Sequence, residues 1–268
     1  MSASQCCAER LPYIGRSNDL DALLSEALHD VKEIMGEDID FVIQQTGLFE
    51  YSDYGLPTTL FAGSARVKSF DKLLFDGLFG QGLRGNYHPE SGRIFLRAET
   101  WCKHCLIHET LHAVSILAAQ QNIAVGNRYL FLREGLTEFL TGYILFRKYP
   151  NCYQAWKNKT YENWCALPPS YEEMARIWFT FCRFVSLNYV KRLFLGNDMQ
   201  TWNDLWNRFL GDIRRSGYPD FRDPMPGGIG RFQDRFLDEC KKRFGKANVE
   251  RIFESESLNF GYGNLRIG

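Results

Sequence analysis

Three histidines and a glutamate lie close together in the segment HCLIHETLH, which ends at His112. His108, Glu109 and His112 form the pattern H-E-x-x-H. Residues i and i+4 share one face of an α-helix, so the two imidazoles converge on one point. Zinc accepts this arrangement at about 2.0 to 2.1 Å per nitrogen and needs at least one more protein ligand. The pattern predicts a zinc site, and the alternative is a buried helix of unusual composition.

Glu109 lies between the two histidines in the sequence but not on their face. Its side chain points about 100° around the helix from His108, which is too far to join the same pair of ligands. It is placed to reach a water molecule on the metal. The expected role of Glu109 is therefore that of a general base.

Two glutamates follow at the same spacing in the segment LREGLTEFLTG. Glu134 and Glu138 are predicted to share one face of a helix whose other face is apolar. One of them can be the third zinc ligand, while the other accepts the free ring N–H of a ligand histidine and fixes its tautomer. The spacing leaves the two roles open, and the alternative is a pair of solvated surface glutamates.

HETLH, followed after 21 intervening residues by EGLTEFLTG, resembles the gluzincin class of zinc metallopeptidases. The resemblance implies a Zn²⁺ ion held by His108, His112 and Glu134, with Glu109 as the general base and Glu138 as the carboxylate that orients a histidine. It also implies a zincin-like fold, in which the strand within YHPESGRIFLRAE lies above the active-site helix and pairs with an extended substrate. The expected partner is therefore a peptide or protein substrate.

The resemblance covers about residues 86–149 and departs from the family pattern at two points. The gap between His112 and Glu134 is slightly longer than in the best-known members, so Glu138 stays as an alternative ligand. Thermolysin-like enzymes use a downstream histidine to stabilise the oxyanion, and no histidine follows His112. That role would fall to a tyrosine or arginine, and the candidates are Tyr171 and Tyr161.

Cys102 and Cys105 form a C-x-x-C pattern just before the H-E-x-x-H motif. This spacing occurs in zinc knuckles and in thiol oxidoreductases. No second C-x-x-C completes a structural zinc site, and no thioredoxin-like pattern surrounds the pair, so we interpret it as helix packing or as a disulfide that locks the helix start. Two other functions stay open, namely a catalytically inactive zinc-binding interaction module and a thiol redox protein that uses these cysteines.

The elements that must position these residues have an α+β order. Hydrophobic periodicity and capping residues predict a helix at 17–36, and β-rich runs predict strands at 40–46, 59–67 and 92–98. Residues 71–92 contain many glycines and indicate a loop. From Thr100 onward the pattern is helical, with amphipathic helices predicted at 100–121 and 132–149 and further helices at 168–194, 202–215 and 231–245. Residues 217–230 indicate a loop, and 258–268 show no core pattern.

We therefore expect one zincin-like domain over residues 1–268. Its strand-rich part, 1–99, would form a small mixed sheet, and its helical part, 100–268, would carry the metal site. Basic and acidic residues balance at 32 each, which argues against nucleic acid as a partner. The first thirty residues do not resemble a signal peptide, and no segment approaches the roughly 18 apolar residues that a membrane span needs. The expected location is cytoplasmic.

Overall fold

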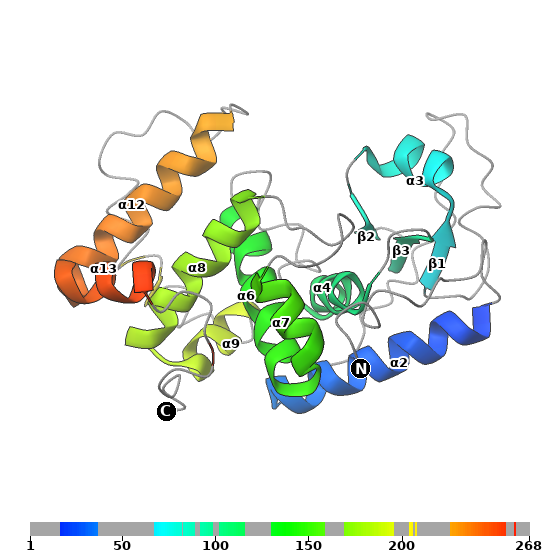
Figure 1. The fold of residues 1–268 in the computed structure, drawn as a ribbon, viewed down its shortest axis with the longest axis horizontal. Helices are drawn as coiled ribbons and strands as arrows, with labels where there is room; N and C mark the ends of the chain where they lie inside the picture. The colour runs from blue at the N-terminus through cyan, green and yellow to red at the C-terminus, as the bar shows by residue number, and fades with distance from the viewer. Residues whose placement is uncertain are drawn as a thin grey trace. The chain divides into compact units, whose positions relative to one another are not determined.

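The computed structural model describes residues 17–36, 67–81, 83–88, 92–98, 102–115, 130–158, 169–195, 204–205, 207, 226–255 and 260. Within these residues the chain is mostly helical and has a small three-stranded mixed sheet, which confirms the α+β class (Figure 1). The chain divides into two compact units. The first unit is Met1–Val114 with Ile144–Ala166, and the second unit is Ser115–Tyr143 with Leu167–Gly268. The expectation of one domain stays a prediction.

The sheet belongs to the first unit and has the strand order β1-β3-β2. Strand β1 (Val67–Phe70) runs parallel to β3 (Arg93–Arg97), and β2 (Gly85–His88) runs antiparallel to it. The strand predicted at 92–98 is thus confirmed. Since β3 is paired on both sides, it offers no edge to a substrate, which corrects the expectation from the resemblance. Among the described strands, β2 is the edge strand on the antiparallel side.

The other two predicted strands lie mostly outside the described residues. The strand predicted at 40–46 lies outside the described residues. Of the strand predicted at 59–67, Val67 alone is described, and it is the first residue of β1. The structure therefore tests this prediction at Val67 alone. Strand β1 continues to Phe70, which lies beyond the predicted run.

The stretch 71–92 contains a helix and a strand where a loop is predicted. Helix α3 (Lys72–Phe79) begins after Asp71, whose carboxylate accepts a hydrogen bond at 2.9 Å from a backbone N–H of the first turn. Phenylalanines of α3 pack against Phe95 of the sheet. The helix ends at Gly80, which has a φ of 95°. The packing of its apolar face therefore stabilises α3 in spite of the glycines in this stretch. Gly80 ends α3, and Gly85 is the first residue of the strand that follows.

Helix α4 (Lys103–Val114) carries the H-E-x-x-H motif and packs against β2, β3 and α2 (Ser17–Met35). The helix predicted at 17–36 is confirmed as α2. Every residue of α4 after the first is buried, so the helix is enclosed on all sides. The prediction of an amphipathic helix is wrong here, and so is its length, because the helix ends at Val114.

A network of charged and phenolic groups holds the start of α4 within the first unit. Lys103 Nζ lies 3.0 Å from Glu26 Oε2 and 4.9 Å from the centroid of the Tyr149 ring. The Tyr149 hydroxyl shares its single proton between the carboxylates of Asp30 and, at 3.0 Å, Glu26. Burial and these acidic partners raise the pKa of Tyr149 well above its usual value. The phenol therefore stays protonated and acts as a donor that ties α2 to the chain beside α4.

The remaining helices correct several predicted boundaries. The helix predicted at 168–194 is two helices, because Ser186 interrupts it and accepts a hydrogen bond from Tyr189 N at 3.0 Å as the cap of the second. The helix predicted at 231–245 begins earlier, inside the predicted loop at 217–230. The helix predicted at 132–149 is confirmed. The observed helices are α6 (Leu130–Lys148), α7 (Pro150–Asn158), α8 (Pro169–Phe184), α9 (Leu187–Leu195), α12 (Pro226–Phe244) and α13 (Lys246–Ser255).

Phe260, the described residue of 258–268, contributes to the core of the second unit, although that segment shows no core pattern in the sequence. Phe260 is 5% exposed. Its ring lies 5.7 Å from the centroid of Phe139, 5.7 Å from Tyr143 and 5.4 Å from Phe179. Of the helix predicted at 202–215, the described residues Asp204 and Leu205 are helical and the rest lies almost wholly outside the description.

Candidate metal centre

The two histidines of the motif meet on one face of α4. Their Nε2 atoms are 3.1 Å apart, and both side chains are buried. Two zinc–nitrogen bonds of about 2.05 Å at a tetrahedral angle would place the two nitrogens roughly 3.3 Å apart. The predicted convergence of His108 and His112 is therefore present, at a separation that fits a shared zinc ion.

The same separation also suits a hydrogen bond between two neutral imidazoles, in which one ring donates its N–H to the other. The geometry thus permits a metal without requiring one. The other polar residue of this part of α4, Thr110, is satisfied inside the helix, because its hydroxyl donates to Leu106 O at 2.7 Å. Between His108 and His112, the buried groups left to do chemistry are therefore the two histidines and Glu109.

Glu109 is directed toward the edge strand of the sheet. Its Oε2 accepts a hydrogen bond of 2.7 Å from the backbone N–H of Tyr87 in β2. Arg97 N donates to Arg84 O in the same strand pair, so by alternation Tyr87 is a position whose N–H points away from β3, along the outer edge of β2. The carboxylate of the predicted general base is therefore held at the outer edge of β2.

Gly85 is the residue of β2 that lets Glu109 come so close. A Cβ atom at Gly85 would lie 2.8 Å from Glu109 Cγ and 3.0 Å from its Oε1. Gly85 and Tyr87 point to the same side of the sheet because strand residues alternate, and that side faces α4. Sequence reasoning missed Gly85 and Tyr87, because the signal, a glycine in a glycine-rich stretch, indicated only a loop.

Replacing Gly85 with alanine should move the Glu109 side chain or the edge strand. We expect the free energy of unfolding to fall by about 1 to 3 kcal/mol, the usual cost of overpacking. The matched control is Gly77→Ala in α3, where an added Cβ meets nothing within 4 Å, and which should gain about 0.5 to 1 kcal/mol from helix propensity. Chemical denaturation of both variants measures the difference. Equal stabilities would contradict the close contact between Gly85 and Glu109.

Glu134 and Glu138 are both buried in α6, at 5% and 0% exposure. The interpretation of this pair as solvated surface residues is therefore wrong. Residues 134–145 are all buried, so α6 is not amphipathic over this stretch either. Glutamate is almost never fully buried unless it is paired or binds a cation, because a carboxylate loses its hydration there. Two buried carboxylates one turn apart in the second unit therefore indicate a functional site or a pair of carboxylates with strong polar partners.

Gly135 stands next to the predicted ligand Glu134, where a glycine could make room for the close approach of the active-site helix. A Cβ at Gly135 would instead lie 2.9 Å from Trp178 Cδ1 and 3.0 Å from Met174 Cβ. Both belong to α8, so the glycine allows α6 and α8 to approach each other within the second unit. It consequently gives no preference for Glu134 over Glu138 as a ligand.

The structure does not test the candidates for stabilising the oxyanion. Tyr171 lies in the first turn of α8 and is partly exposed, in the second unit. Tyr161 lies outside the described residues. The assignment of Tyr171 as a catalytic residue therefore stays a prediction.

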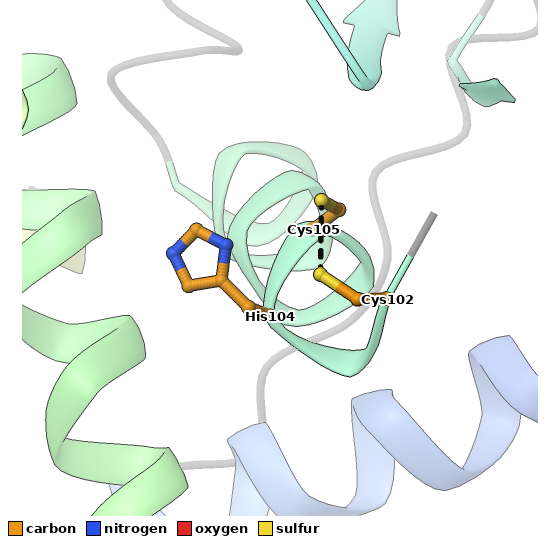
Figure 2. Close-up of side chains that lie close together, drawn as sticks. All are labelled: Cys102, His104 and Cys105. Carbon is orange, nitrogen blue, oxygen red and sulfur yellow. Dashed lines mark hydrogen bonds between the residues drawn. The ribbon is translucent and has the colours of Figure 1, made fainter. Parts of the chain in front are cut away.

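The cysteines of the C-x-x-C pair are reduced thiols, so the predicted disulfide at the helix start is not formed. Their Sγ atoms are 3.3 Å apart, and Figure 2 shows the two thiol groups turned toward one another at the first turn of α4, with the ring of His104 beside this turn. Cys152, by contrast, is disulfide-bonded. Thiol chemistry at Cys102 and Cys105 is thus available.

Comparison of the chain with protein-family models, with curated proteins and with solved structures gave no match. None of the helices in the described part of the chain has the length and apolar character needed to cross a membrane. A functional assignment must therefore come from the site residues and their geometry.

Proposed function

We propose that this protein is a zinc-dependent metallopeptidase with a zincin-like fold, in which His108, His112 and Glu134 hold the metal. The observation that carries the proposal is the 3.1 Å separation of the Nε2 atoms of His108 and His112 on one buried face of α4. Glu134 is taken as the third ligand because the resemblance to the gluzincin class implies it. Glu134 and Glu138 are both buried, and a dication would compensate a buried carboxylate at either position.

The proposed reaction is hydrolysis of a peptide bond. When bound, zinc supplies polarisation of the scissile carbonyl and lowers the pKa of a water molecule toward about 7. Glu109 takes the proton from the attacking water and returns it to the leaving amine. Tyr171 is the proposed donor to the developing oxyanion. In this mechanism Glu138 accepts a ring N–H from a histidine and keeps its other nitrogen directed at the metal.

The edge strand β2 supports a peptide as the substrate. An extended peptide can add to an exposed strand edge through main-chain hydrogen bonds. The outer edge of β2 carries the N–H of Tyr87, which Glu109 contacts. Because the Tyr87 N–H is already bonded to Glu109, a substrate that pairs with the other main-chain groups of this edge would lie beside the proposed general base.

The proposal is tested by metal analysis of the purified protein together with a peptide-library digest, with and without a chelator. We expect bound zinc, cleavage of some peptides and loss of cleavage on chelation. Metal-replete protein that cleaves no peptide would favour an inactive zinc-binding module instead.

The two buried glutamates should differ when each is changed to glutamine. If Glu134 is the third ligand, Glu134→Gln should abolish tight zinc binding, because a neutral amide oxygen is a poorer ligand for a dication. Glu138→Gln should be milder and cost roughly 10 to 100-fold in affinity or activity, as expected when a histidine loses its orienting acceptor. A competition titration of both variants against a zinc chelator ranks them.

A matched control is Glu172→Gln, a glutamate of α8 whose carboxylate lies 3.4 Å from Arg176 near the surface. This variant should bind zinc like the wild type. Weaker binding by Glu138→Gln than by Glu134→Gln would reverse the assignment and move the third ligand one turn along α6.

A further inference from the structure

The first turn of α4 brings together a second set of metal-binding side chains. The ligand atoms of Cys102, His104 and Cys105 all lie within 4.8 Å of one another, and all three residues are buried. Cys102 immediately precedes α4, and His104 and Cys105 lie in its first turn, within the first unit. The histidine pair used above lies further along the same helix. Two thiols and an imidazole are the donor set that zinc and other borderline or soft ions prefer.

The position of the cysteines favours negatively charged sulfur. Cys102 precedes the helix, and its carbonyl accepts the first helical hydrogen bond, from Leu106 N at 3.1 Å. The N–H groups of a first helical turn carry partial positive charge and stabilise thiolates placed beside them. The nearest cation in the sequence, Lys103, is paired with Glu26 at 3.0 Å, so its charge is largely compensated. The turn can therefore accept two thiolates and a dication.

The sulfur separation is closer to that of a metal site than to that of a disulfide. Two zinc–sulfur bonds of about 2.3 Å at a tetrahedral angle place the sulfurs roughly 3.8 Å apart, whereas a disulfide needs about 2.05 Å. The observed 3.3 Å would have to open by about half an ångström for zinc and close by more than one ångström for a disulfide. Rotation of one thiol about its χ1 angle supplies the smaller change.

We infer that Cys102, His104 and Cys105 form a second metal site, which takes zinc or a similar thiolate-binding cation. Binding replaces the two thiol protons, which leave to solvent, and the imidazole nitrogen is the third ligand. A cation held there joins the residue before α4 to its first turn and so stabilises the start of the helix that carries His108. The site does not depend on the proposed peptidase activity.

Cobalt(II) distinguishes this site from the histidine site, because thiolate ligands give an intense charge-transfer absorption in the near ultraviolet that histidine and carboxylate ligands do not give. The full chain is stripped of metal, reduced with a phosphine and titrated with cobalt. In the His108→Ala/His112→Ala variant we expect the thiolate band to saturate at one cobalt per chain. In Cys102→Ser/Cys105→Ser the band should be lost, while the histidine site still binds.

Cys182→Ala is the control for cysteine replacement. Burial raises the pKa of the Cys182 thiol, so this group stays protonated and the variant should keep the full band. Failure of the peptidase proposal would appear as unchanged metal content in the histidine variant, and failure of the second site as a missing thiolate band in folded protein. The two results are read independently.

Should the double serine variant fail to fold, X-ray absorption of zinc-loaded wild type gives the answer. Sulfur scatterers at about 2.3 Å are expected, and their number should fall in each of the single variants Cys102→Ala and Cys105→Ala. Zinc with nitrogen and oxygen neighbours only would overturn the second site. It would equally be overturned if the band persisted in the double serine variant, or if peptide mapping of zinc-treated protein showed Cys102 joined to Cys105.

Discussion

Replacing His108 or His112 with alanine is expected to remove one equivalent of zinc from each chain and to abolish peptide hydrolysis. The two Nε2 atoms are 3.1 Å apart, so each variant removes one of two convergent donors and leaves the other with too few partners to bind zinc tightly. The loss of affinity should exceed the roughly 10 to 100-fold that follows removal of an orienting residue. Metal analysis after dialysis and a competition titration measure it.

His29→Ala is the matched control, since the His29 side chain is 75% exposed on α2. It should keep the zinc content and the activity of the wild type. Circular dichroism must show that the His108 and His112 variants keep their helices, because both residues are buried. Folded variants that retain full zinc would remove the basis of the proposed active site.

Local spacing predicted the part of the site that depends on one helix. The i and i+4 positions of His108 and His112 become a pair of adjacent nitrogens as soon as α4 forms, whatever packs around it. The same rule places Glu134 one turn before Glu138. It does not reveal that both are buried, because carboxylates at this spacing look alike on a solvated helix and on an enclosed one.

The features that sequence reasoning missed depend on residues far apart in the chain. Gly85 matters because Glu109 lies against it, and Gly135 matters because Trp178 does, and neither contact leaves a local signal. The helix break at Ser186 was missed because the apolar periodicity continues on both sides of a serine that caps the next helix. Phe260 packs on three aromatic rings of other segments, although its own neighbours show no pattern.

The contact between Glu109 and β2 is also a long-range contact, and it bears on the proposed role of Glu109 as general base. The spacing alone gave Glu109 a direction, about 100° away from the histidine face. The structure adds a fixed partner, the Tyr87 N–H at the outer edge of β2. A general base must be held in place to act repeatedly on the same water molecule, and this hydrogen bond supplies that constraint.

Glu109→Gln is therefore expected to keep the metal and to lose nearly all turnover. Glutamine has almost the same shape and retains an oxygen that accepts the Tyr87 N–H, so α4 and β2 should keep their contact. It cannot take a proton at neutral pH, and loss of a general base typically costs about 10² to 10⁴-fold in rate. The measurement is kcat on a cleaved peptide together with zinc content, and the reduction should appear in kcat and in kcat/KM alike.

The control for this change is Glu250→Gln on α13 in the second unit, where the glutamate carboxylate lies 3.5 Å from Lys241 Nζ. That variant should match the wild type in both measurements. Two results for Glu109→Gln would contradict its assigned role in different ways. Hydrolysis at the wild-type rate would mean that another group is the base, whereas loss of zinc would mean that Glu109 is itself a ligand and that its hydrogen bond to Tyr87 is exchanged when metal binds.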